Sequence, residues 1–523
     1  MEGREERSLL SFRGIPFAAS TGGENRLRAP RPAAPWQGVL DARHFARAAP
    51  QPVPAFRLSR RWSAVPRAGA GEDCLNLNIW TPAADAGRRP VLVWLHGGGF
   101  SHGSGSFPLY AGRGMAARGD AVVVTLNYRL GVLGGLDLRS FPGGESTDTN
   151  LALRDQIAGL QWVQSNIEAF GGDPDCVTLF GQSAGAMSAA ALMASPRCKG
   201  LFHRAILQSG AGDHVHAPSR ARELATLFLE KLGLDPGRGD LLTALRGMDW
   251  KALVEAQVAM RSAHGLALGQ LAWQPVVDGD LVPDLPRVRF ERGEAARVPL
   301  LIGTNLDEWK MFTATDSRRR GMDEETLRDY LTRTFAVDDR AHTQHEGTGE
   351  GQKTVEEALA LYRMQPRGEL RSAGEIWAAL QGDRVFRYPA IRLGDAHARS
   401  GASTFFYRFE WKPPLAPRRV GACHALELAF VFGTLRSPAI RPLFGVSSMA
   451  PKLSRRMQDR WLAFARSGDP RTGEGDAWPD YRAESGEAIS LGGSGRAHKA
   501  MGPALRDFWD GRDQTPGEPE LPG

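Results

Sequence analysis

Long apolar runs, cysteines and lysines are scarce in this chain of 523 residues. No apolar run approaches the about 18 residues that a membrane-spanning helix needs, so we expect no membrane span. Residues 1–6 lack the basic start and apolar stretch of a secretory signal peptide. The four cysteines, Cys74, Cys176, Cys198 and Cys423, are scattered along the chain. They favour reduced thiols and a cytoplasmic protein, although secretion stays open if the true start lies upstream.

A strong excess of one charge is also missing. The net charge of +6 is small for this length, and the basic residues are mostly dispersed arginines. The basic triplet at 318–320 is explained by a solvated helix end, so we expect no nucleic-acid partner. His214 and His216 form a pair, but without an HExxH motif, paired cysteines or a carboxylate cluster nearby. We therefore expect neither a metal nor an organic cofactor.

The most informative segment that is present is Gly181-Gln182-Ser183-Ala184-Gly185. An apolar run at 176–180 leads into it, and a small-residue stretch at 186–194 follows. This order predicts a strand, a tight turn and a helix, with the Ser183 hydroxyl held above the edge of a sheet by a strained backbone. A serine in this setting is a candidate nucleophile.

A second segment supplies the groups that acyl transfer requires around a developing oxyanion. The apolar run at 90–95 ends in His-Gly-Gly-Gly at 96–99, where missing side chains let backbone N–H groups approach a ligand. Donors fixed before the reaction stabilise the negative charge of a tetrahedral intermediate. We predict that the N–H groups of Gly98, Gly99 and Ala184 form this oxyanion hole.

The base and the acid should follow the nucleophile in the order acid, then histidine. A short buried strand is predicted at 299–304, and Asp307 and Glu308 come soon after it. His424 precedes the apolar segment 429–433. Chemistry alone does not choose among the 12 histidines or between Asp307 and Glu308.

Ordered matches along nearly the whole chain resemble the type-B carboxylesterases, the family that includes the cholinesterases, and in particular its bacterial branch. The resemblance implies an α/β-hydrolase fold, with a large, mostly parallel, twisted central sheet flanked by helices and interrupted by helical insertions. It assigns Ser183 as nucleophile, His424 as base and Glu308 as acid. It also implies two structural ion pairs, Arg26 with Glu72 and Arg129 with Asp155. The matching segments are 12–18, 72–79, 127–131, 155–156, 169–174, 181–185, 201–210 and 275–279.

Because the motifs extend from residue 12 to residue 433, we expect one catalytic domain over 1–523. Two stretches are interpreted as helical insertions: about 218–257, which shows Leu-rich helical periodicity, and about 323–380. The Pro-rich end, about 512–523, is expected to fray.

Some positions depart from the family pattern. Gln182 stands where the family usually carries Glu, and Cys74 occupies a disulfide position whose partner position falls at Ala49. The family resemblance places the wall of the acyl pocket near Gly269 and Leu271, which implies a roomier acyl pocket than in cholinesterases. The predicted substrate pocket comprises Gln182, Gly269, Leu271, Trp309 and Phe312.

The resemblance implies a serine carboxylesterase that hydrolyses short to medium, uncharged carboxylic esters through an acyl-enzyme. An alternative is hydrolysis of a carbamate or activated amide by the same triad, and a non-catalytic esterase-like binding protein is a more distant one. We expect a small-molecule ester as the partner and a monomer in solution.

Overall fold

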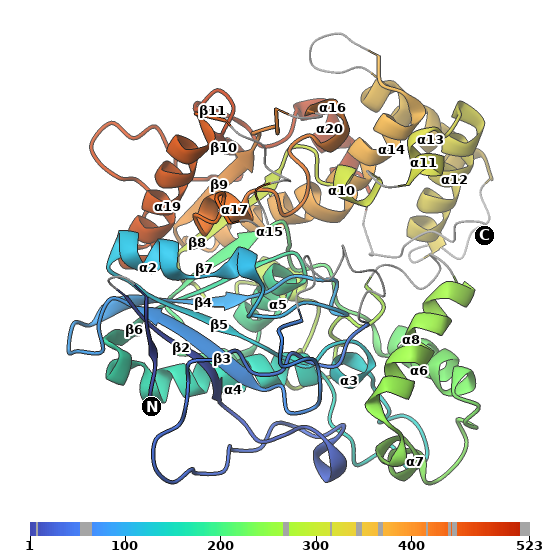
Figure 1. Ribbon diagram of the computed structural model, residues 1–523. Coiled ribbons are helices and arrows are strands. Elements are labelled where there is room, and N and C mark those ends of the chain that lie inside the picture. Colours follow the sequence, from blue (N-terminus) through green and yellow to red (C-terminus); the bar gives the residue numbers. More distant parts are fainter. Residues whose placement is uncertain are drawn as a thin grey trace.

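In the described part of the chain, a sheet of 11 strands forms the centre of the computed structural model (Figure 1). Its strand order is β1-β2-β3-β5-β4-β6-β7-β8-β9-β10-β11. Neighbouring strands from β5 through to β10 are parallel, whereas β1, β2, β3 and β11 join by antiparallel pairing. The predicted large, mostly parallel sheet is therefore confirmed. The structure describes residues 1–6, 9–52, 65–264, 271–313, 316–340, 348–363, 370–414, 417–437, 441 and 447–512.

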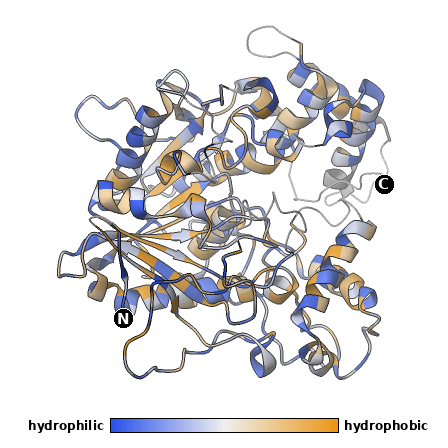
Figure 2. Ribbon diagram, in the orientation of Figure 1, coloured by the Kyte–Doolittle hydropathy of each residue, from blue (hydrophilic) through white to orange (hydrophobic). Residues whose placement is uncertain are grey.

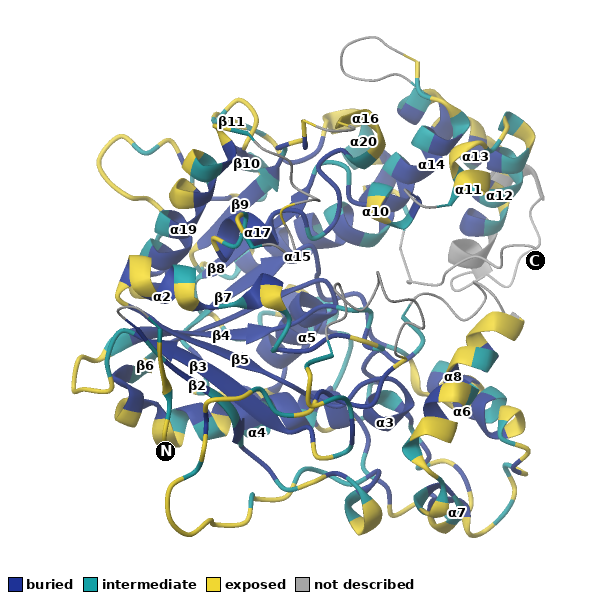
Figure 3. Cartoon of the chain, viewed as in Figure 1, coloured by how far each residue is buried: buried dark blue, intermediate teal, exposed yellow. Residues whose placement is uncertain are grey.

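The strands are short and rich in β-branched and aromatic residues, as buried parallel strands require. Figure 3 shows the strands between the two edge strands β1 and β11 as the most continuously buried part of the molecule. The bounds of the strands are β1 Arg4–Glu6, β2 Leu9–Pro16, β3 Asn76–Thr81, β4 Arg89–Leu95, β5 Val122–Leu126, β6 Gly172–Gln182, β7 Arg204–Gln208, β8 Leu300–Asn305, β9 Thr404–Phe409, β10 Glu487–Leu491 and β11 Ala497–Lys499.

Helices cover both faces of the sheet because successive strand side chains point to opposite sides. In β4, Val93 joins the apolar core that includes α4 (Leu151–Asn166) and α5 (Ala184–Met193). Its neighbour Trp94 joins the core on the other face, which includes α2 (Arg113–Gly119) and α19 (Ala450–Ser467). Figure 2 shows the hydrophobic residues concentrated in the strands between these layers.

Two helical groups extend from the layered body, and both lie on the right-hand side of Figure 1. The first comprises α6 (Pro218–Lys231), α7 (Leu241–Gly247) and α8 (Trp250–His264). The second comprises α12 (Glu324–Arg340), α13 (Thr348–Arg363) and α14 (Ala373–Gly382). They occupy the two segments in which we expected helical insertions. Residues 513–523, which hold nearly all of the tail expected to fray, lie outside the described ranges.

The remaining helices are short connections or pack near the chain's C-terminal end. A π-helical turn, η6 (Asp383–Arg387), joins α14 directly to α15. The bounds of the others are α3 Val132–Gly135, α9 Pro286–Glu291, α10 Lys310–Thr313, α11 Ser317–Arg320, α15 Tyr388–Arg399, α16 Pro417–Val420, α17 Leu428–Val431 and α20 Pro503–Asp510, with 3-10 turns at Gly23–Asn25, Pro108–Tyr110, Ile167–Phe170 and Pro196–Cys198.

Both ion pairs implied by the family resemblance are present. Arg129 and Asp155 are buried and pair at 2.6 Å, and Asp155 also accepts the backbone N–H of Arg129 at 3.0 Å. Arg26 pairs with Glu72 at 2.6 Å and donates to the carbonyls of Leu245 and Met248. Arg26 thus ties the N-terminal segment to the C-terminal end of α7.

Candidate active site

Four neighbouring parallel strands end at the same edge of the sheet, and a candidate site residue or segment follows each of them. The glycine loop follows β4, Ser183 follows β6, Ser209 follows β7 and Glu308 lies just beyond β8. Carboxyl ends of adjacent parallel strands are where open α/β sheets bind ligands. The topology therefore assembles residues that lie more than 200 positions apart in the chain.

The predicted strand-turn-helix around Ser183 is confirmed. Ser183 has φ 56° and ψ −128°, a strained conformation for a non-glycine residue, between the end of β6 and the start of α5. A side chain at Gly185 would collide with the carbonyl oxygen of Leu95, and one at Gly181 would meet the Gly185 backbone at 2.5 Å. Both glycines are thus required by the close approach of α5 to the sheet.

The glycine loop after β4 adopts backbone conformations that glycine adopts more readily than other residues. Gly98 and Gly99 have φ of +129° and +59°. The N–H groups of Ser101 and His102 both donate to the Gly98 carbonyl at 3.1 Å, which closes the turn. Within the described part of the chain, the N–H groups of Gly98 and Gly99 have no hydrogen-bond acceptor. No acceptor among the described residues therefore competes with a ligand for these two donors.

Ala184 offers a third backbone donor. It is the first residue of α5, where N–H groups precede the intrahelical hydrogen-bond ladder. Gln51 supports the glycine loop from the side, because its amide accepts from the Gly103 N–H at 2.9 Å and donates to the Gly103 carbonyl at 2.9 Å.

His424 and Glu308 are joined by a short hydrogen bond. His424 Nδ1 lies 2.7 Å from Glu308 Oε2, and both side chains are buried. The other oxygen, Glu308 Oε1, accepts from the Ser209 hydroxyl at 2.6 Å and from the Asn305 N–H at 2.7 Å. Because Glu308 accepts through Oε1 from two donors, we assign Oε2 as the acceptor and His424 Nδ1 as the donor of this hydrogen bond.

Asp307 faces away from the histidine. It pairs with Lys310 at 3.0 Å and with Lys412 at 3.6 Å, and it accepts the Ala422 N–H at 3.0 Å. Burial opposes ionisation of Asp307, but the two lysines hold its pKa below the usual value. Its role in the structure is to anchor the loop that carries His424.

The second ring nitrogen of His424 contacts Gln182. The Gln182 Nε2 lies 2.9 Å from His424 Nε2, so the amide donates to this nitrogen when the imidazole is neutral. Phe386, from η6, packs on the ring with centroids 4.5 Å apart, and Phe312 packs at 5.4 Å. Trp309 lies 4.7 Å from Phe312. Three predicted pocket residues, Gln182, Trp309 and Phe312, therefore gather around the imidazole.

The remaining pocket predictions are less well placed. Leu271 lies beside His216, and no contact among the described residues joins it to His424. Gly269 lies outside the described ranges. Sequence reasoning gave no role to Ser209, Asn305 or Phe386. A signal existed for Ser209, because it directly follows a strand whose end lies at the same edge as Ser183.

Of the histidine pair at 214 and 216, His216 has structural hydrogen-bond partners, whereas the buried Nδ1 of His214 has none among the described residues. His216 Nε2 lies 3.1 Å from the Ala272 carbonyl, and its Nδ1 lies 2.8 Å from the Gln274 amide. Burial lowers the pKa of both histidines to about 4. In the described ranges, no group of three or more His, Cys, Asp or Glu side chains is arranged to hold a metal ion.

The four cysteines are unpaired in the structure. Burial raises the pKa of the Cys423 thiol, which precedes His424, to about 12. Among the helices that the structure describes, none combines the length and the apolar character needed to cross a membrane.

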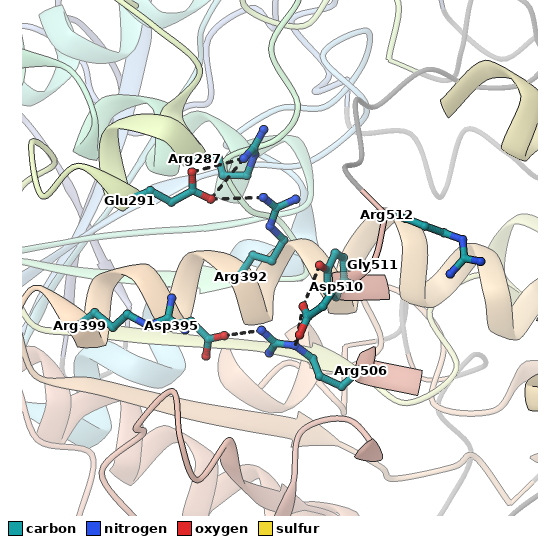
Figure 4. A pocket seen from close by; sticks show the side chains of 10 residues that line it. Arg287, Glu291, Arg392, Asp395, Arg399, Arg506, Asp510, Gly511 and Arg512 are labelled. Atoms are coloured by element: carbon teal, nitrogen blue, oxygen red, sulfur yellow. Dashed lines mark hydrogen bonds and ion pairs between the residues drawn. The ribbon is translucent and has the colours of Figure 1, made fainter. Parts of the chain in front are cut away.

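A surface pocket of about 590 Å³ lies between α9, α15 and α20 (Figure 4). Its walls carry two ion-pair groups, one in which Glu291 pairs with Arg287 and Arg392, and one in which Arg506 pairs with Asp395 and Asp510. None of Ser183, Glu308 and His424 is among its lining residues. The pocket is therefore separate from the candidate active site.

Comparisons with known proteins agree with this arrangement. The model of the carboxylesterase family matches residues 1–509. The para-nitrobenzyl esterase of Bacillus subtilis (strain 168) is 37% identical over 491 residues, which cover 94% of this chain and 93% of that protein. The phenmedipham hydrolase of Pseudarthrobacter oxydans is 34% identical over 505 residues, with 94% and 93% covered. The solved structure of a thermophilic PNB esterase matches with a TM-score of 0.82 at 36% identity, covering 97% of both chains.

These matches confirm the resemblance and the α/β-hydrolase fold predicted from the sequence. The identity extends over nearly the full length of both proteins in each comparison, so the conclusion applies to the whole chain. The chain belongs to the carboxylesterase family and is a carboxylic ester hydrolase.

Proposed function

We propose that this protein is a serine carboxylesterase with Ser183 as nucleophile, His424 as base and Glu308 as acid. The observation that carries the proposal is the 2.7 Å hydrogen bond between His424 Nδ1 and Glu308 Oε2, at the sheet edge where Ser183 occupies its strained turn. A serine hydroxyl is a poor nucleophile at neutral pH and needs a neighbouring base to act.

In the proposed mechanism, His424 takes the proton from Ser183 as the hydroxyl attacks the ester carbonyl. The N–H groups of Gly98, Gly99 and Ala184 stabilise the oxyanion, and removing one such donor typically costs about 10²–10³ in rate. His424 then protonates the departing alkoxide, which leaves an acyl-enzyme on Ser183. Water, activated by the same base, releases the acid and restores the serine.

The hydrogen bond from the Gln182 amide to His424 must break during this cycle. The amide donates to His424 Nε2 in the resting structure, which is the nitrogen that receives the serine proton. When His424 becomes an imidazolium, Nε2 turns into a donor and the amide nitrogen can no longer pair with it. A half-turn of the Gln182 carboxamide would present its oxygen instead.

The neutral side chains around the His424 ring favour binding of uncharged substrates. The groups that contact its ring on this side are Phe312, Phe386 and the neutral amide of Gln182. A charged ester would lose hydration there without gaining an ionic partner from these three described side chains. We therefore propose short to medium, uncharged carboxylic esters as the substrate class.

A relative named for the hydrolysis of phenmedipham favours a second candidate, hydrolysis of a carbamate or activated amide by the same triad. A panel of nitrophenyl esters of rising acyl length, run beside nitrophenyl carbamates, separates the two. The ester proposal expects kcat/KM to peak at short to medium acyl chains. Faster turnover of the carbamates would reverse the order of the candidates.

The triad itself is tested by labelling with a fluorophosphonate and locating the adduct by peptide mass spectrometry. The adduct is expected on Ser183, with loss of esterase activity in proportion to labelling. Active enzyme in which Ser183 stays unlabelled while another residue reacts would overturn the assignment.

A further inference from the structure

A second buried carboxylate, Glu427, lies three residues after His424, and the proposed mechanism does not use it. Its side chain is fully buried just before α17. Glu427 Oε2 accepts from Asn305 Nδ2 at 2.6 Å, and Oε1 accepts from Gln208 Nε2 at 3.2 Å. Among the described residues, no arginine or lysine pairs with it. A buried carboxylate with only neutral donors calls for an explanation.

The side-chain amides of Asn305 and Gln208 are each held in orientation by a further hydrogen bond to another residue. Asn305 Nδ2 also donates to the Cys423 carbonyl at 2.7 Å, and Gln208 Oε1 accepts from Trp461 Nε1 at 3.0 Å. Neither amide can therefore turn its oxygen towards Glu427 without losing a second hydrogen bond. Both oxygens of Glu427 are accordingly held as acceptors, an arrangement that favours the ionised form.

Asn305 joins this carboxylate to the proposed triad. Its backbone N–H donates to Glu308 Oε1 at 2.7 Å while its side chain donates to Glu427. Gln208 is linked to the nucleophile, because its carbonyl accepts the Ser183 N–H at 2.9 Å. Glu427 thus contacts, through one residue on each side, the segments that position the acid and the nucleophile.

The charge of Glu427 changes near neutral pH. Burial and the negative charge of Glu308 raise its pKa to about 7, against the hydrogen bond from Asn305 and the attraction of His424. Protonation of His424 and ionisation of Glu427 therefore stabilise each other. Other titratable groups that the structure describes beside this cluster include Tyr110, Tyr407 and Cys423, whose pKa values burial raises so that they stay neutral, and Asp307, whose negative charge acts on Cys423.

We propose that Glu427 is a positioning residue of the hydrolytic site: through Asn305 it holds Glu308 in place, and its negative charge favours the imidazolium form of His424. This inference rests on the triad proposed above. It extends the triad to a pair of buried carboxylates, only one of which touches the histidine.

The test is the variant Glu427→Gln, which keeps the size of the side chain and removes its charge. The pH dependence of kcat/KM is measured with a neutral nitrophenyl ester, beside the pH dependence of Ser183 labelling by a fluorophosphonate. Without the charge, the imidazolium is less favoured, so the acidic limb of both profiles should move to lower pH by about half a unit. The plateau of kcat/KM should fall by about threefold, the same free energy expressed as a rate.

Asp395→Asn is the matched control. Asp395 is equally buried but pairs with Arg506 beside the surface pocket of Figure 4, so its loss should leave both limbs in place. An acidic limb that does not move in folded Glu427→Gln would overturn the proposal. A purely structural role would lower the melting temperature and leave the limb unchanged.

A second variant covers the case in which Glu427→Gln does not fold. Gln208→Met removes one donor from Glu427 without altering a charge, which raises the pKa of Glu427 and should shift the limb in the same direction by a smaller amount. No shift in this variant would also count against the proposal. Failure of the triad itself looks different, because wild-type enzyme would then carry no label on Ser183.

Discussion

Two buried charged clusters in this molecule are built in opposite ways. The Arg129–Asp155 pair matches a cation with a carboxylate, and the guanidinium donates from Nε and Nη2 to both carboxylate oxygens, at 2.7 and 2.6 Å. In the described structure, Glu308 and Glu427 have no arginine or lysine partner and accept instead from an imidazole, a hydroxyl and amides.

The difference separates a fixed charge from one that changes during turnover. A bidentate guanidinium gives Asp155 a permanent counter-charge, so this cluster holds loops without taking part in proton transfer. An imidazole partner can gain and lose a proton near neutrality, so the cluster around Glu308 can follow a reaction. We therefore expect damage to the first cluster to reduce stability and damage to the second to reduce turnover.

The largest effect should follow removal of the nucleophile or the base. Ser183→Ala or His424→Ala should lower kcat by about 10⁴-fold or more while leaving the melting temperature nearly unchanged, because either change removes covalent catalysis. Steady-state kinetics and thermal unfolding of the same preparations check this. Residual activity within tenfold of wild type would refute the triad.

The choice of acid predicts the next largest effect. Glu308→Gln should reduce kcat by about 10³–10⁴-fold, since an amide in place of the carboxylate no longer fixes the imidazole tautomer. Asp307→Asn is the matched control and should cost less than about tenfold, because Asp307 bonds to lysines and the Ala422 N–H rather than to His424. Equal damage from the two variants would contradict the assignment.

This pair of residues shows what the sequence could and could not predict. Local signals were enough for the strained turn at Ser183 and the glycine loop, because both depend on residues adjacent in the chain. Choosing Glu308 over Asp307 needed the family resemblance, since both carboxylates follow the same strand and differ only in where the turn directs them. The role of Asn305 between two carboxylates depends on contacts 118 and 122 positions away, which no local pattern records.

Glu427 is a second residue whose role could not be predicted from the sequence alone. The segment 422–432 is apolar except for His424 and Glu427, so a carboxylate within a run of core residues was a visible signal. Its partners Asn305 and Gln208 come from two different strands, and only the sheet order places them together. The fold class was therefore predictable from motifs, whereas the electrostatics of the site required the topology.

A change to the structural cluster should act on stability alone. Asp155→Asn leaves the buried Arg129 without its counter-charge and should reduce the free energy of unfolding by about 3–5 kcal/mol. The kcat of the remaining folded fraction should stay within about threefold of wild type. Denaturant unfolding beside active-site titration with a fluorophosphonate separates the two quantities. A large fall in kcat per labelled site would contradict the prediction that the Arg129–Asp155 cluster affects stability alone.

The smallest expected effect is that of Gln182→Glu, which adds a carboxylate beside His424. This variant tests whether an added charge makes the cluster around His424 resemble the Arg129–Asp155 ion pair. Gln182 Nε2 lies 2.9 Å from His424 Nε2 and donates to the neutral imidazole. In Gln182→Glu the carboxylate has no proton to donate, so it pairs well only with the imidazolium, whose Nε2 carries a proton. The charged form is therefore favoured, and the acidic limb of kcat/KM, which reports the base in the free enzyme, should move to higher pH. Because the pair is buried, added salt should reduce the shift only modestly. The measurement is kcat/KM against pH for both enzymes with one neutral ester, at low and high salt. A limb that stays in place or moves to lower pH would mean that residue 182 does not sense the charge on His424.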